Sequence, residues 1–250
     1  GFSTPSFVWN GLLNGLLKKG YSVLVYDHYG RGFSERPRNK YSLDFYVKTL
    51  KELISHQSID EKIHLVGYSM GGPIIGGFAE KYSNQVKSLS FIAPAGFGKV
   101  QTSFPFFMKI PGVIEWAMHV LADRFYGSAI SSETTHSSDP LSINEEEFQR
   151  LFSFQMQFKG FRESLASTMR NFNLFDARDM FEKVAAKNIP SIAIWGDNDG
   201  VVSYRGAETY SEIFHEGKVI TIQDGTHDIT YRQPSDVLEA INIFLDSQIP

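Results

Sequence analysis

Residues 62–73 read KIHLVGYSMGGP and set one serine, Ser69, between Gly67 and Gly71. The first half of this stretch is apolar and typical of a strand, and the segment over 70–81 is typical of a helix. A serine at a tight turn between a strand and a helix has its hydroxyl exposed above the sheet. The two glycines are expected where neighbouring backbone comes too close for a Cβ. The free N–H groups at the start of the helix would face any negative charge that forms near the serine.

The composition fits one α/β domain with room for an insertion. The chain has 250 residues, a formal net charge of −4 and 21% charged residues, so nothing points to nucleic acid as a partner. It has no cysteine, which excludes thiolate chemistry and disulfides. No stretch is long and apolar enough to cross a bilayer. The histidines of the first three quarters are too scattered for ligand spacing, so neither a metal nor another cofactor is expected.

Predicted strands and helices alternate on both sides of this stretch. Before it, the pattern predicts a helix over 7–19, a strand over 21–27 and a helix that begins with Ser42 as its N-cap. After it, the pattern predicts a strand over 86–92 and, much later, a strand over 189–195, a helix over 204–214, a strand over 218–222 and a final helix capped by Ser235. This alternation predicts a parallel sheet with helices on both faces.

The alternation stops between 97 and 188, where the pattern predicts helical segments and loops only. Two aromatic-rich blocks, 104–118 and 148–161, lie on either side of a polar loop over 131–144. We interpret 97–188 as a helical cap inserted into an α/β core made of 1–96 and 189–250. The aromatic side chains can either form the core of the cap or line a pocket under it.

A serine hydroxyl is a poor nucleophile unless a base lies within hydrogen-bond reach and a third group orients that base. His227 lies in a loop directly after a predicted strand, and such loops build the sites of α/β folds. His215 lies at the end of a predicted helix, where an imidazolium would complement the helix dipole, and is interpreted as structural. The acid is expected in the loop after the preceding predicted strand. That loop offers both Asp197 and Asp199, and spacing alone leaves both open.

Three motifs together resemble the α/β-hydrolase superfamily. They are GYSMGG at 67–72, WGDNDGVV at 195–202 and DGTH at 224–227, in the order serine, aspartate, histidine. The loop DHYGRGFS at 27–34 also resembles a turn that is common in capped members. The resemblance covers nearly the whole chain and implies an α/β-hydrolase fold with an inserted helical cap.

The resemblance also implies roles for individual residues. Ser69 and His227 match the nucleophile and base, and the fourth position of the family pattern Gly-x-x-Asp selects Asp199 as the acid. The backbone N–H groups of Met70 and Phe2 match the two donors of the oxyanion hole, because Gly1-Phe2 resembles the end of a His-Gly-Phe motif. In the family topology a central strand ending in that histidine precedes Gly1, and it lies between the strands over 21–27 and 63–67. That strand and two edge strands before it are therefore expected upstream.

The activity that the resemblance implies is cleavage of carboxylic esters through an acyl-enzyme, as in esterases and lipases. Surplus aromatic side chains in the cap predict an apolar ester with a medium-length acyl chain as the small-molecule substrate. A carbon–carbon bond hydrolase with the same triad is an alternative, although such relatives tend to carry asparagine where this chain has Tyr68. Haloalkane dehalogenases and epoxide hydrolases use aspartate at the position of Ser69. A hydrolase-like receptor, whose pocket binds a small molecule with incidental turnover, also stays open.

Overall fold

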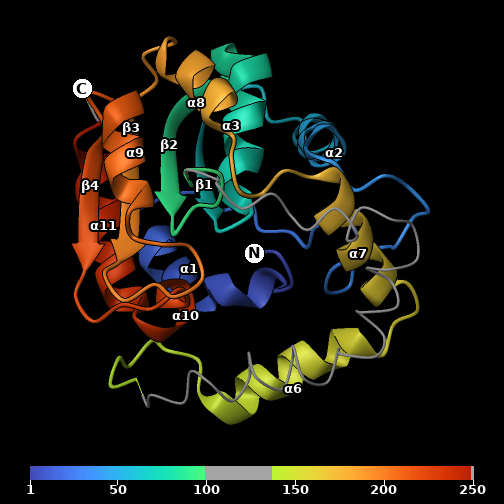
Figure 1. Cartoon of the computed structure of the whole chain (residues 1–250). Helices are drawn as coiled ribbons and strands as arrows, with labels where there is room; N and C mark the ends of the chain where they lie inside the picture. The colour runs from blue at the N-terminus through green and yellow to red at the C-terminus, as the bar shows by residue number, and fades with distance from the viewer. Residues whose placement is uncertain (99–136, 249–250) are drawn as a thin grey trace.

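The computed structural model describes residues 1–98 and 137–248, and these form a parallel sheet between two layers of helices (Figure 1). The sheet has the strand order β1 (Ile63–Tyr68), β2 (Val86–Ile92), β3 (Ser191–Gly196) and β4 (Lys218–Ile222). All three pairings are parallel. The loops that follow β1, β3 and β4 therefore all begin at the carboxyl ends of the strands, which brings distant segments of the chain together.

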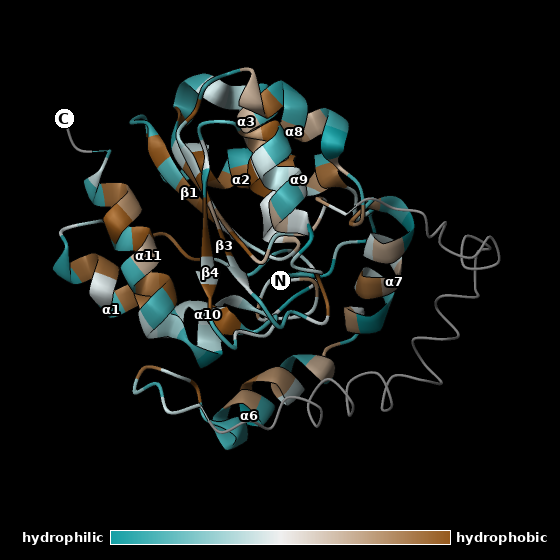
Figure 2. Cartoon of the chain, turned by 60° about the vertical axis from the view of Figure 1, so that its left-hand side comes forward, coloured by the Kyte–Doolittle hydropathy of each residue, from teal (hydrophilic) through white to brown (hydrophobic). Residues whose placement is uncertain are grey.

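Successive side chains of a strand point to opposite faces, so the sheet divides the apolar core in two. One face carries Leu89, Phe91 and Trp195 and is covered by α2 (Leu43–His56), α3 (Gly71–Tyr82), α8 (Arg178–Ala185) and α9 (Gly206–Ile213). The other face carries Ile92, Ile192 and Ile194 and is covered by α1 (Asn10–Lys18) and α11 (Pro234–Asp246). Figure 2 shows the sheet between these two helical layers.

The helices predicted outside 97–188 are present, with ends that differ from the predicted ranges by one to three residues. Ser42 caps α2 as expected, since its hydroxyl accepts a hydrogen bond from Phe45 N–H at 3.3 Å. The expected cap at Ser235 is wrong, because α11 begins one residue earlier at Pro234. Proline suits the first helical position, where no N–H is needed, and the Ser235 hydroxyl instead donates to Asp139. Two short 3₁₀ helices, Ser6–Trp9 and Ser83–Gln85, precede α1 and β2.

The expected strand over 21–27 does not join the sheet. Residues 21–27 have no strand assignment, and in the described part of the chain β1 pairs only with β2. An extended segment belongs to a sheet only through ladder hydrogen bonds. A cavity of about 590 Å³ lies between this segment and β1, with Val23, Val25 and Leu65 among its lining residues. The two segments are not directly paired, so the expected strand between them stays a prediction.

Two helices lie apart from the sheet, across from the carboxyl ends of its strands. They are α6 (Glu145–Met156) and α7 (Phe161–Asn171), and the arrowheads in Figure 1 point toward the space that they flank. α8 instead packs on α3, so by its packing it belongs to the helical layer of the core. The cap boundaries at 97 and 188 stay a prediction, and the aromatic block over 104–118 lies outside the described residues.

The second aromatic block divides between core and surface. Phe148, Phe152 and Phe161 are buried, and Phe148 stacks on Tyr231 with 5.1 Å between ring centroids. Phe154 is 43% exposed. Phe148 also meets the ring of Phe7 edge-on, so its burial includes contacts with the α/β core, and both interpretations of the aromatic blocks stay predictions. Among the helices that the structure describes, none has the length and apolar character needed to cross a membrane.

Candidate active site

Ser69 occupies the turn between β1 and α3 in a strained backbone conformation. Its φ is +52°, which is uncommon for a residue with a side chain. A Cβ at Gly67 would lie 2.5 Å from the carbonyl oxygen of Gly71, so Gly67 is required by close backbone approach. A Cβ at Gly71 itself would meet nothing within 4 Å, so the expected steric reason does not hold there. The turn is held by Ser69 N–H, which donates to Ile92 C=O at 2.9 Å.

Ser69, His227 and Asp199 form one continuous hydrogen-bonded chain. The Ser69 Oγ lies 3.0 Å from His227 Nε2, and His227 Nδ1 lies 2.8 Å from Asp199 Oδ2. The other oxygen of Asp199 accepts hydrogen bonds from Val201 N–H at 2.9 Å and Val202 N–H at 2.7 Å. The Asp199 side chain is fully buried and the His227 side chain is 12% exposed. A carboxylate held in this way can only accept, which orients the imidazole toward Ser69.

The structure shows which of the two candidate aspartates lies next to His227. Asp199 reaches the imidazole, whereas Asp197 makes its contact through its backbone, donating from N–H to Ile222 C=O at 3.2 Å. One carboxylate oxygen of Asp197 is buried without a hydrogen-bond partner among the described residues. His215 is exposed in the turn between α9 and β4, near the amino ends of the strands and away from Ser69.

The two expected oxyanion donors belong to residues at or near the elbow. Met70 is fully buried at the N-cap position of α3. Gly1, which precedes Phe2, lies against the neighbour of the nucleophile, since a Cβ added to it would be 3.2 Å from a ring carbon of Tyr68. Within the described residues, neither Met70 N–H nor Phe2 N–H has a recorded hydrogen-bond partner.

A charged network beside His227 escaped the sequence analysis. Asp228 is 2% exposed and accepts a hydrogen bond from Arg232 Nε at 3.3 Å, across the short helix α10 (Ile229–Arg232). Arg232 also donates to Glu145 in the first turn of α6, at 2.6 Å. Burial alone would lower the pKa of Arg232, but the hydrogen bond to Glu145 and the two carboxylate charges raise it. The spacing of four between Asp228 and Arg232 is the signal that could have indicated this pair.

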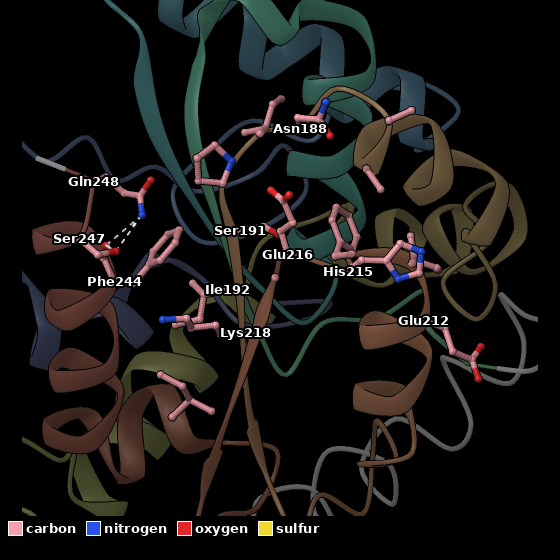
Figure 3. Close-up of a pocket in the computed structure, with 18 of the residues that line it drawn as sticks. Asn188, Ser191, Ile192, Glu212, His215, Glu216, Lys218, Phe244, Ser247 and Gln248 are labelled. Atoms are coloured by element: carbon pink, nitrogen blue, oxygen red, sulfur yellow. Dashed lines mark hydrogen bonds between the residues drawn. The ribbon is translucent and has the colours of Figure 1, made fainter. Parts of the chain in front are cut away.

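The pocket in Figure 3 lies away from this site. It has a volume of about 790 Å³ and is lined by residues such as Asn188, His215 and Lys218, at the amino ends of β3 and β4. Its lining includes none of the three residues of the hydrogen-bonded chain. Catalytic groups of parallel sheets gather at the carboxyl ends of the strands, so this pocket is not the candidate active site. The described residues contain no group of three or more His, Asp or Glu side chains placed to hold a metal ion.

Comparison with known proteins places this geometry in a family. The model for the alpha/beta hydrolase fold matches residues 1–232, and the chain belongs to this family. A solved bromoperoxidase from Bacillus anthracis superposes with a TM-score of 0.81 at 21% identity, covering 98% of this chain and 89% of that one. A thermophilic esterase from Thermogutta terrifontis superposes with a TM-score of 0.77 at 19% identity, covering 99% and 88%. These likenesses establish the fold.

Curated proteins of similar sequence include lipases. Lipase 3 of Moraxella sp. (strain TA144) is 27% identical over 227 residues, which cover 84% of this chain and 64% of that protein. A monoacylglycerol lipase of Mus musculus is 23% identical over 257 residues, covering 99% of this chain and 74% of that protein. The chain thus spans 64% of the length of Lipase 3 and of Lipase 1 of Psychrobacter immobilis.

Proposed function

We propose that this protein is a serine hydrolase that cleaves carboxylic esters through an acyl-enzyme, with a preference for medium-length acyl chains. The observation that carries the proposal is the hydrogen-bonded chain from Ser69 through His227 to Asp199 at the carboxyl edge of the sheet. The similarity to bacterial lipases and to monoacylglycerol lipases supports an ester as the substrate.

The chemistry follows from the positions of the groups. Ser69 Oγ attacks the acyl carbon while its proton passes to His227 Nε2, and Asp199 stabilises the imidazolium that forms. The carbonyl oxygen becomes an oxyanion, which the N–H groups of Met70 and Phe2 bind. Collapse of this intermediate breaks the ester C–O bond, and His227 donates the proton to the departing alcohol. Water then attacks the acyl-enzyme with His227 as base, which releases the carboxylic acid and restores Ser69.

The test is turnover of p-nitrophenyl butyrate by the full-length protein and by four variants. We expect sustained turnover by the unchanged protein, and losses of at least about a thousandfold in kcat for Ser69→Ala and His227→Ala. The double variant should lose little more than either single one, because the residues act as a unit. The matched control is His215→Ala, which removes a histidine near the amino ends of the strands and should keep full activity. Unimpaired turnover by Ser69→Ala would overturn the proposal.

The same assay separates the other functions. A hydrolase-like receptor would release about one equivalent of p-nitrophenol and then stop. A carbon–carbon bond hydrolase would turn over a vinylogous diketone much faster than the ester. Tyr68 occupies the position where such relatives tend to carry asparagine, and its ring lies 5.3 Å from that of His227, so we expect the ester to be preferred.

A further inference from the structure

The segment that carries Phe2 lies between the sheet and helices α6 and α7. Figures 1 and 2 both place the N-terminal residue in this space, near the carboxyl ends of the strands. A backbone N–H acts in an oxyanion hole only when its position and direction are fixed in advance. The contacts of this segment therefore decide whether Phe2 N–H can serve as a fixed donor.

Arg31 holds the carbonyl of Phe2. Its Nε donates to Phe2 C=O at 2.5 Å, and its guanidinium carbon lies 5.5 Å from the centre of the Phe2 ring. Its other nitrogens donate to Gly30 C=O at 3.2 Å and to two hydroxyls of α7, Ser164 at 2.8 Å and Thr168 at 3.2 Å. Arg31 is 0% exposed. One buried guanidinium thus joins the Phe2 backbone to the first two turns of α7.

Gln155 holds the next carbonyl along the chain. This residue of α6 is 1% exposed, and its Nε2 donates to Ser3 C=O at 2.8 Å. Its Oε1 accepts from Gly32 N–H at 3.0 Å, directly beside Arg31. Two successive carbonyls of the segment are therefore clamped, one by a residue of α6 and one by a residue that α7 holds.

Burying the guanidinium of Arg31 lowers the stability of the fold, so stability does not explain the clamp. The four hydrogen bonds described above for Arg31 all go to neutral acceptors, two carbonyls and two hydroxyls, and a buried charge held by neutral groups is unfavourable. Departures from such rules are expected where function requires them. Each peptide unit is planar and includes the Cα atoms at its two ends, so holding the Phe2 carbonyl also holds the Cα of Phe2. The N–H of Phe2 is one bond away from that Cα and can turn only about the φ and ψ bonds of this one residue. The remaining turn of Phe2 N–H is restricted by the position of Gly1, since a Cβ added there would lie 3.2 Å from a ring carbon of Tyr68.

We propose that Arg31 and Gln155 are positioning residues for the oxyanion hole, which keep Phe2 N–H aimed at the acyl oxygen. This inference rests on the proposed function of Ser69 and extends it. Gln155 belongs to α6 and Arg31 is held by α7. Phe2 N–H is therefore in place only when both helices are packed on the core. The seating of the helices therefore controls kcat as well as access to the site.

The experiment compares Arg31→Lys, Gln155→Met and their double variant in the full-length protein. Lysine keeps the charge but cannot contact the Phe2 carbonyl and both hydroxyls at once, and methionine keeps the volume of Gln155 without its hydrogen bonds. We expect each single variant to lower kcat for p-nitrophenyl butyrate by about tenfold to a hundredfold, with KM changed less than about threefold. The double variant should lose less than the product of the two losses, because both residues act on one segment.

A second measurement separates positioning from a general loss of structure. An alkyl trifluoromethyl ketone forms an oxyanion when Ser69 adds to it, so its inhibition constant should rise in proportion to the fall in kcat/KM. The matched control is Arg36→Met, since Arg36 lies in the same loop and donates to the carbonyls of Gly32 and Ser34 instead. We expect kcat of this variant to stay within about twofold of the unchanged protein. Thermal unfolding midpoints show whether each variant is folded.

The outcomes distinguish this inference from the proposed function. If Ser69→Ala abolishes turnover while Arg31→Lys and Gln155→Met lower kcat no more than Arg36→Met does, the inference is wrong and the function stands. If Ser69→Ala keeps its turnover, the function itself is wrong. Should Arg31→Lys fail to fold, Gln155→Met alone decides, because it removes no charge and retains the volume of the side chain.

Discussion

His227 has both ring nitrogens engaged, and this determines which of them carries the proton. Asp199 already accepts two backbone N–H groups through its other oxygen, so it is held as an acceptor facing Nδ1. The Nδ1 must then donate, which leaves the lone pair of Nε2 for the proton of Ser69. The role of Asp199 in the proposed mechanism is thus to select a tautomer as well as to balance charge.

This account predicts different results for the two neighbouring aspartates. In Asp199→Asn the amide can turn its NH₂ toward the imidazole and favour the wrong tautomer, so kcat for p-nitrophenyl butyrate should fall by about three to four orders of magnitude. Asp197→Asn should change kcat by less than about tenfold, because the Asp197 side chain makes no contact with His227. Equal losses in the two variants would contradict the assignment of the acid.

At the scale of elements, the loops after β3 and β4 can touch because Gly196 and Gly225, which have no Cβ, lie where the two backbones meet. A Cβ on Gly196 would lie 2.2 Å from the carbonyl oxygen of Gly225, and Asn198 N–H donates to that same carbonyl at 2.9 Å. These loops carry Asp199 and His227 respectively. The short distance between the acid and the base therefore depends on backbone contact between two connections that follow adjacent strands.

Gly196→Ala should separate these loops and weaken the contact between Asp199 and His227. We expect kcat to fall by at least about tenfold, since small misplacements of catalytic groups are costly, and the thermal midpoint to drop as well. Gly200→Ala is a matched control in the same loop, because a Cβ there would meet nothing within 4 Å. Full activity in Gly196→Ala would show that the loops can part without disturbing the site.

At the scale of the whole molecule, α6 makes hydrogen bonds to two separate segments of the candidate site. Arg232 links Asp228, next to His227, to Glu145 at the start of α6, while Gln155 near the end of α6 contacts Ser3. One helix therefore touches both the loop of the base and the segment of an oxyanion donor.

Acyl-chain preference tests this arrangement as a whole. Each buried methylene contributes about 0.8 kcal/mol at best, so we expect butyryl and octanoyl p-nitrophenyl esters to be bound more tightly than the acetyl ester, through lower KM. The measurement is kcat/KM for the three esters on the full-length protein, with Ser69→Ala as the blank. A steady fall from acetyl to octanoyl would indicate a small, polar pocket instead.

The sequence by itself determined the strand, turn and helix around Ser69, the strands and helices of the core that follow it, and the loops that carry the acid and the base. These are local features: apolar spacing, glycines at tight turns and caps are all read from residues close together in the chain. The cap at Ser235 was wrong for a local reason too, since the proline before it is the better helix start.

Only the tertiary structure decided what distant residues do to one another. Residues 21–27 have strand-like sequence but no strand, because ladder hydrogen bonds come from neighbours in space and not from local preference. Arg31 and Gln155 meet the Phe2 segment across 29 and 152 residues of chain, through contacts that depend on how α6 and α7 pack on the core. A residue's type sets which hydrogen bonds it can make, whereas the packing of whole helices sets which partners come within reach.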